Sequence, residues 1–305
     1  GTAYANHGVN MVPFFIYYSM FGFQRVGDFI WAAGDLRTRG FLMGATAGRT
    51  TLAGEGLQHQ DGHSLLLAST VPNCRAYDPT YAYELAVIIQ DGMRRMYADG
   101  ESVFYYVTVM NENYAMPAMP KGVEQGILKG MYLLSIGGRG KVRANLLGSG
   151  TILREVQAAA EILERDYGVP ADVFSVPSFS ELRREALDCE RWNLLNPNEK
   201  PRVPYVAQCL SGHEGPFIAA TDYMRTVPDQ VRQWVPGEYV TLGTDGFGRS
   251  DARAELRHHF EVDRRFVVLA ALKALVDDKK LDRKTLAKAM ADLGIDAAKP
   301  NPLIS

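Results

Sequence analysis

The stretch Gly54-Glu55-Gly56-Leu57-Gln58-His59-Gln60-Asp61-Gly62-His63-Ser64 is the part of the sequence around which the rest of the chain is organised. Its glycines permit backbone angles closed to other residues and let a ligand approach closely. His59 and His63 can titrate near neutral pH, and Glu55 and Asp61 can hold a histidine tautomer or move a proton. So many ionisable groups among glycines predict a functional loop rather than a plain connection.

Composition excludes several classes of protein. The chain has 305 residues, 47% of them hydrophobic, so it can bury a full core and is long enough for about two domains. A formal net charge of -2 provides no basic field for nucleic acid, and no apolar run approaches the roughly 18 residues that cross a membrane. Cys74, Cys189 and Cys209 form no C-x-x-C pair. They favour a reducing, cytoplasmic compartment.

Hydrophobic patterning predicts strands that alternate with helices. The expected strands are residues 12–18, 40–46, 103–110, 141–147, 172–176, 217–221 and 239–242. The expected helices are residues 21–31, 80–96, 151–167, 251–259, 266–277 and 283–293. This alternation predicts an α/β protein with mostly parallel sheets covered by helices on both faces. A shift in composition near Lys121 predicts two domains, residues 1–120 and residues 121–305.

Three polar turns carry more specific expectations. Asp78 precedes Pro79 and is a candidate cap for the helix at 80–96. Ser250-Asp251 is the corresponding cap for the helix that ends near His259. Gly148-Ser149-Gly150 stands before a helix and could cradle an anion, although such a turn more often only joins a strand to a helix.

The stretch of residues 54–64, called the organising loop below, also has simpler interpretations. His59 and His63 are four residues apart, as metal ligands on a helix often are, and Glu55 or Asp61 could complete a site. That spacing brings two ligands together only on a helix, and the glycines favour a loop. Taken alone, His59 is better explained as a hydrogen-bonded structural histidine. The aromatic residues of 17–23 most simply form core.

Five stretches together carry a resemblance to a known family. They are GTAYANHGVNMVPFFIYYSMFGFQRVGD from Gly1, GRTTLAGEGLQHQDGHS from Gly48, NENYAMPAMP from Asn111, DCERWN from Asp188 and GTDGFGRSD from Gly243. The chain resembles, from Gly1 to Ser305, the homodimeric pyruvate dehydrogenase E1 component of bacteria, a thiamine-diphosphate family of the transketolase superfamily. His59-Gln60 and the Gly243–Ser250 pattern match features that transketolase-like enzymes share.

The resemblance implies a domain order of diphosphate-binding, pyrimidine-binding and C-terminal domains. Residues 1–120 would form most of the pyrimidine-binding domain, and residues 121–305 would form the C-terminal domain. The ligands of the magnesium ion and the glutamate that protonates the aminopyrimidine are expected upstream of Gly1, in a part of the protein that this chain lacks. No metal ligand is therefore assigned here, and Glu55 is not that glutamate. Because the family's active site lies between two subunits, the resemblance also implies a homodimer.

The resemblance assigns roles to five residues. Phe21 matches the aromatic residue that stacks on the aminopyrimidine, and Tyr18 matches a tyrosine that faces the thiazolium and the substrate. His59 matches the histidine that contacts the substrate-derived adduct and can shuttle a proton. Glu55 is close enough in the loop to tune His59, and Arg25 is placed near the cofactor.

The implied reaction is decarboxylation of pyruvate, followed by transfer of the two-carbon group to the lipoyl group of the E2 acetyltransferase. Another thiamine enzyme, such as a transketolase acting on sugar phosphates, would need several basic groups around the loop, where only Arg49 is near. A metal-dependent hydrolase using His59 and His63 and a non-catalytic dimerisation fragment are the alternatives from other classes. In the thiamine-enzyme interpretation His63 is structural.

Overall fold

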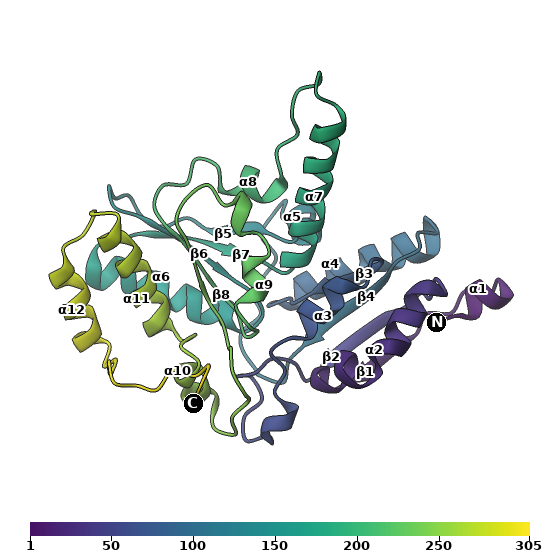
Figure 1. The fold of residues 1–305 in the computed structure, drawn as a ribbon, viewed down its shortest axis with the longest axis horizontal. Helices are drawn as coiled ribbons and strands as arrows, with labels where there is room; N and C mark the ends of the chain where they lie inside the picture. The colour runs from purple at the N-terminus through teal and green to yellow at the C-terminus, as the bar shows by residue number, and fades with distance from the viewer.

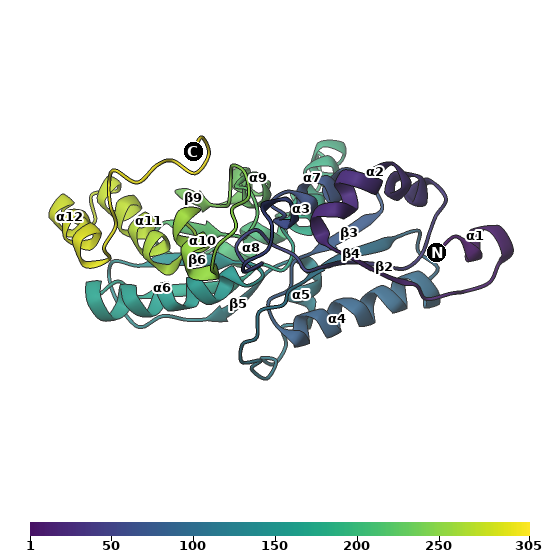
Figure 2. The same cartoon turned by 90° about the horizontal axis from the view of Figure 1, so that it is seen from below.

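The computed structural model describes residues 1–305 and contains two separate sheets, which Figures 1 and 2 show side by side. The first sheet is parallel throughout, and its strands lie in the order β1-β2-β4-β3. These strands are β1 (Phe14–Tyr17), β2 (Phe41–Ala45), β4 (Phe104–Val109) and β3 (Cys74–Tyr77). The predicted α/β class is confirmed, although β3 was not predicted.

Helices cover both faces of the first sheet. α2 (Ser19–Asp35) and α3 (Ser64–Thr70) lie on one face and α4 (Ala82–Met93) on the other. Successive side chains of a strand point to opposite faces of the sheet. Two neighbouring tyrosines of the central strand β4 therefore show how each face is covered. Tyr106 belongs to the cluster with Phe23 of α2, and Tyr105 to the cluster with Ile88 of α4. Both tyrosines are fully buried, so this strand is buried on both faces, as in parallel sheets generally.

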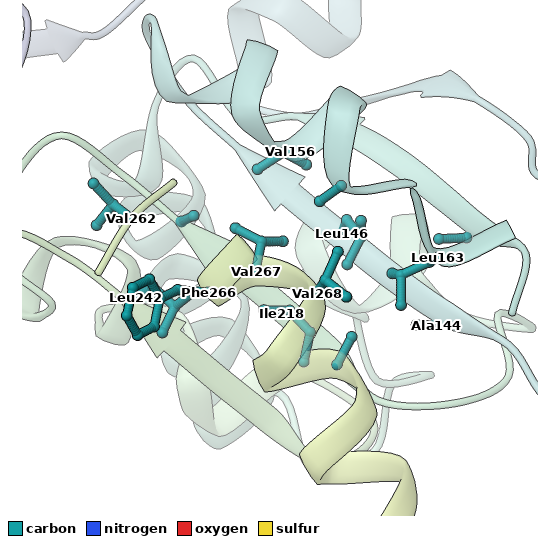
Figure 3. Packing of buried hydrophobic residues seen from close by; sticks show 14 of the residues in the cluster. Ala144, Leu146, Val156, Leu163, Ile218, Leu242, Val262, Phe266, Val267 and Val268 are labelled. Atoms are coloured by element: carbon teal, nitrogen blue, oxygen red, sulfur yellow. The ribbon is translucent and has the colours of Figure 1, made fainter. Parts of the chain in front are cut away.

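The second sheet has the strand order β5-β7-β6-β8-β9, with only β5 antiparallel. Its strands are β5 (Tyr132–Ser135), β7 (Ala171–Ser175), β6 (Ala144–Gly148), β8 (Phe217–Ala220) and β9 (Tyr239–Leu242). α6 (Ile152–Tyr167) and α11 (Arg264–Asp277) pack on one face, where Figure 3 shows their apolar side chains meeting those of β6, β8 and β9. α7 (Phe179–Leu195) and α8 (Tyr205–Leu210) pack on the other face.

The two sheets share a continuous apolar core. One cluster of buried residues contains Phe23 and Ala68 from the helices of the first sheet together with Phe174 and Phe217 of the second. The connection between the sheets runs from β4 to α5 (Glu124–Lys129), and the domain boundary predicted near Lys121 falls in it. Dividing the chain there remains a prediction.

The remaining elements are short or lie at the ends of the chain. They are α1 (Ala3–His7), η1 (Leu57–His59), η2 (Arg94–Ala98), α9 (Thr226–Asp229), η3 (Arg232–Trp234), α10 (Arg253–His259) and α12 (Arg283–Asp292). None of the helices is long and apolar enough to cross a membrane.

Two predicted helix caps are wrong. α4 begins at Ala82, and Glu84 reaches back so that its Oε2 accepts hydrogen bonds from the backbone N–H groups of Thr80 and Tyr81. Asp78 lies too far upstream to cap this helix, and its carboxylate meets other hydroxyl groups. α10 begins after Ala252, whose own N–H donates to the carboxylate of Asp251.

Candidate active site

The start of α2 presents the first part of the site. Tyr18 immediately precedes the helix, and Phe21 and Arg25 follow at spacings that place side chains on one helical face. The rings of Tyr18 and Phe21 lie 6.0 Å apart between centroids, and the guanidinium carbon of Arg25 lies 4.1 Å from the centroid of the Phe21 ring. Tyr18 is 41% exposed. The helix therefore presents a tyrosine and a partly open aromatic ring with a cation on one side.

His59 approaches these aromatic rings from the organising loop. It ends the single turn η1, and its imidazole centroid lies 5.1 Å from the ring of Tyr18 and 5.1 Å from that of Phe21. The Nδ1 atom lies 3.9 Å from Oε2 of Glu55 and has no hydrogen-bond partner. A small approach of the Glu55 carboxylate would let it accept the proton of Nδ1 and fix the tautomer. All five residues assigned by resemblance thus lie together.

His63 is engaged elsewhere. Its Nε2 meets the side-chain amide of Gln24, which lies on α2 three residues after Phe21. Burial lowers the pKa of His63, and nearby Arg49 lowers it further while Asp61 opposes the change. The imidazole is therefore neutral at pH 7, so that Nε2 can accept a hydrogen bond from the Gln24 amide. This contact ties the helix bearing Phe21 to the segment that follows His59.

Asp61 fixes the end of the loop. Its Oδ1 accepts hydrogen bonds from the backbone N–H groups of His63, at 3.0 Å, and Ser64, at 2.9 Å. These N–H groups open α3 and have no partner within the helix, as is usual for a first turn. Asp61 is fully buried, so this ionisable group of the loop is structural. An aspartate two or three residues before the first N–H groups of a helix is a capping signal, so this role of Asp61 could have been predicted from the sequence.

The glycine-rich turn of residues 243–251 lies against the same loop, although it is almost two hundred residues away in sequence. Arg49 donates from Nη1 to the carbonyl oxygens of Thr244, at 2.6 Å, and Gly246. The side-chain Oε1 of Gln60 accepts a hydrogen bond of 2.6 Å from the N–H of Arg249. Neither Arg49 nor Gln60 was assigned to the site from the sequence, since their partners could be known only from the folded chain.

The Gly148-Ser149-Gly150 turn receives a carboxyl group of the protein itself, that of Asp78. Ser149 Oγ donates to Oδ2 of Asp78 at 2.8 Å, and Thr108 Oγ1 donates to Oδ1 at 2.6 Å. Burial raises the pKa of Asp78 to about 7 against these two hydrogen bonds, which lower it. The turn therefore joins β6 to α6 and holds the end of β3 in place.

The pattern of a histidine-ligated metal site is not supported by the side-chain geometry. His59 contacts two aromatic rings, while His63 contacts Gln24. Within residues 1–305 no three His, Cys, Asp or Glu side chains are grouped so as to hold a metal ion.

The fold and this arrangement of side chains define a protein with the transketolase-like fold. Solved structures agree: a transketolase from Campylobacter jejuni superposes with a TM-score of 0.66 at 18% identity, covering 89% of this chain and 37% of that one. A transketolase from Pichia stipitis superposes with a TM-score of 0.64 at 17% identity, covering 88% of this chain and 35% of that one. At such identities the likeness concerns the fold.

Sequence comparison gives the family. Residues 1–117 match the pyruvate dehydrogenase E1 component middle domain, and residues 130–263 match the transketolase-like C-terminal domain. The pyruvate dehydrogenase E1 component of Pseudomonas aeruginosa is 63% identical over 99% of this chain and 35% of its own length. That of Escherichia coli (strain K12) is 58% identical over 100% of this chain and 34% of its own length. The chain belongs to the family of pyruvate dehydrogenase E1 components and spans about a third of the length of these relatives.

Proposed function

We propose that this chain forms the pyrimidine-binding side of a thiamine-diphosphate site that decarboxylates pyruvate. The observation that carries the proposal is the convergence of Tyr18, Phe21 and His59 with Glu55, at the positions that the family resemblance assigns to cofactor and substrate. The two-carbon product would pass to a lipoyl group on an E2 acetyltransferase.

The residues present fit the cofactor's aminopyrimidine. Phe21 is half-buried, the rings of Tyr18 and His59 lie near it in tilted orientations, and Arg25 lies over one face. A flat apolar ring of this kind holds an aromatic heterocycle while leaving the nitrogens of the heterocycle free for directed hydrogen bonds. When bound, the cofactor supplies the electron sink for loss of carbon dioxide. In this proposal the magnesium ligands lie outside these residues.

His59 would hold or move a proton at the oxygen derived from the keto group of pyruvate. If the Glu55 carboxylate moved closer than the present 3.9 Å, a hydrogen bond from Nδ1 would leave Nε2 with its lone pair, so that Nε2 could accept a proton. Glu55 thereby acts through His59. Tyr18 adds a phenol hydroxyl on the same side, which can orient the substrate by donating a hydrogen bond.

The burial and hydrogen bonding of Arg49 favour pyruvate over a sugar phosphate as the substrate. Arg49 is the basic residue closest in sequence to the loop, but its side chain is buried and donates to two backbone carbonyl groups. It is therefore not free to bind a phosphate group. A transketolase-type substrate would need several cations that face the site, where Arg25 alone of the assigned residues is basic.

We further propose that the complete protein is a cytoplasmic homodimer, because in this family the site is completed by a second subunit. The proposal is tested with the full-length protein by titrating thiamine diphosphate and Mg²⁺ and then measuring carbon dioxide released from pyruvate. A ketose phosphate tested in parallel, with an aldose acceptor, separates the transketolase alternative. Turnover of the ketose phosphate without release of carbon dioxide from pyruvate would refute the proposed substrate.

A further inference from the structure

We propose that the glycine-rich turn Gly243–Arg249 of the C-terminal region holds the His59 loop in its working position, and that Arg49 and Gln60 are the positioning residues of this clamp. The inference rests on the proposed function for its catalytic consequence. It gives the C-terminal region a part in catalysis without any contact with the substrate.

The loop does little to hold its own shape. Within residues 54–60 its backbone makes a bond from the N–H of His59 to the carbonyl of Gly56, at 2.9 Å, and one from Gln60 to Leu57, at 3.3 Å. Two bonds close a single turn, which is far below the length at which a helix is stable alone. The position of His59 must therefore be set by contacts from outside the loop.

Arg49 is the first of these contacts. Its side chain is only 6% exposed and has no carboxylate within ion-pair distance, which is a costly state for a charged group. Burial lowers the pKa of Arg49, although Asp61 and Asp222 oppose this. Besides these aspartates, the carbonyl oxygens of Thr244 and Gly246 compensate the burial. Both accept from the same nitrogen, Nη1, so one end of the guanidinium is fixed to the turn.

Gln60 is the second contact and is bonded directly to the peptide of His59. It is 1% exposed, its Oε1 accepts from the N–H of Arg249 at 2.6 Å, and its Nε2 donates to the carbonyl of Leu52 at 3.5 Å. The Gln60 side chain therefore connects the glycine-rich turn, the loop that carries His59 and the segment that leads from β2 into this loop. Loss of its acceptor would leave the N–H of Arg249 unpaired in a partly buried place.

The backbones themselves also touch. A Cβ atom added to Gly248 would come within 2.5 Å of the carbonyl oxygen of Leu57 and 3.1 Å of Cβ of Gln60. Gly248 therefore presses its backbone against the turn Leu57–His59, and any larger residue must displace one of the two segments. Further along, the N–H of Gly54 donates to the carbonyl of Asp251 at 3.0 Å. The loop is thus held at both ends and at its middle.

The test uses the full-length protein with two variants. Gln60→Met removes the hydrogen bonds of the Gln60 side chain, and Gly248→Ala pushes on the loop without changing Gln60. Gln157→Met is the matched control, because Gln157 also accepts one side-chain hydrogen bond, from Tyr81 at 2.8 Å, but lies on α6. Amide hydrogen exchange of residues 54–60, cofactor affinity and kcat are measured for each, with exchange in α11 reporting whether the fold is intact.

We expect Gln60→Met and Gly248→Ala to speed exchange in residues 54–60 and to lower kcat by about 10- to 100-fold, the scale of an ångström's misplacement of a catalytic group. Cofactor affinity should change less than about twofold, because Phe21 on α2 is untouched. Gln157→Met should retain fast turnover and slow exchange in the loop.

Unchanged exchange and unchanged kcat in both Gln60→Met and Gly248→Ala would overturn the proposal. Equal losses in Gln60→Met and Gln157→Met would also overturn it, because the hydrogen bond of Gln157 is with Tyr81 and lies outside the loop. If the unmodified protein does not decarboxylate pyruvate, the proposed function fails, whereas hydrogen exchange still decides whether the turn holds the loop.

Discussion

Replacing Asp78 with asparagine is expected to change how the stability of the protein depends on pH. Asp78 follows β3 and is buried where the carboxyl ends of the two sheets face each other, with Ser149 Oγ at 2.8 Å and Thr108 Oγ1 at 2.6 Å. No cation contacts the carboxylate. Hydroxyl groups can donate to a carboxylate or accept from a carboxylic acid, so they accommodate either state.

The size of the effect follows from the pKa of Asp78. Burial raises this pKa from the ordinary 3.8 to about 7. Between these two pH values the folded chain binds one proton more than the unfolded chain, so stability falls as pH rises. The stabilisation is complete below about pH 4 and is lost by about pH 8. At 1.36 kcal/mol per pH unit, the interval corresponds to a loss on the order of 4 kcal/mol.

Asparagine has nearly the same shape and no titratable proton, so Asp78→Asn should remove this part of the pH dependence. Urea unfolding of the chain at pH 5 and pH 8 measures it. The unmodified chain should lose more stability between these values than the variant, and the variant should be the more stable of the two at pH 8.

Asp172 provides a control position, where the same substitution is expected to change stability in the opposite direction. This carboxylate is also buried, but it accepts hydrogen bonds from Arg143 and His213, both at 2.7 Å. Asp172→Asn removes the negative charge that faces the Arg143 guanidinium and should destabilise the chain at both pH values. If Asp78→Asn lost stability at pH 8 as Asp172→Asn does, the carboxylate of Asp78 would be charged and stabilising, and the reasoning would be refuted.

Three further predictions concern the candidate site. His59→Ala in the full-length protein should leave the fold intact and lower pyruvate turnover by ~10²–10⁴, the range for a positioned acid–base group; turnover at the original rate would remove His59 from the catalytic residues. Phe21→Ala should weaken thiamine diphosphate binding by roughly 1–3 kcal/mol, by analogy with the loss of a stacking partner for a nucleobase. Calorimetric titration measures this, and unchanged affinity with lowered stability would make Phe21 a core residue only. Gln24→Glu should raise the pKa of His63, because an adjacent negative charge favours the imidazolium; an NMR titration in which His63 keeps its original pKa would contradict the Gln24 contact.

Local patterns were enough to predict the regular elements that have strong signals. The helix expected at 151–167 appears as Ile152–Tyr167, because its apolar residues repeat on one face and Gly168 ends it in a left-handed conformation at φ 64°. The strand Cys74–Tyr77 was missed because it has only four residues, and its apolar pattern is interrupted by Arg75, which pairs with Glu181. The helix Phe179–Leu195 was missed because charged residues dominate it, although Ser178 caps it by accepting from the N–H of Glu181.

The failed caps have a common physical reason. Asp78 and Asp251 are good capping residues by type, but a cap depends on where the chain turns into the helix, to within one residue. Tertiary contacts decided that point. Asp78 is held by Ser149 from the other sheet, which left Glu84 to satisfy the first N–H groups of α4.

Local patterns and motifs were enough to predict the α/β class and the family, and they also proposed residues for the candidate site. They did so because periodicity is a local property and because Tyr18, Phe21, Arg25, Glu55 and His59 lie in two short motifs. The distant groups that hold these motifs in place could be identified only in the folded chain. Hydrogen bonds from Arg49 and to Gln60 join segments separated by almost two hundred residues. Such bonds have no local signature, because their energy depends on burial and geometry that exist only after both sheets have packed together.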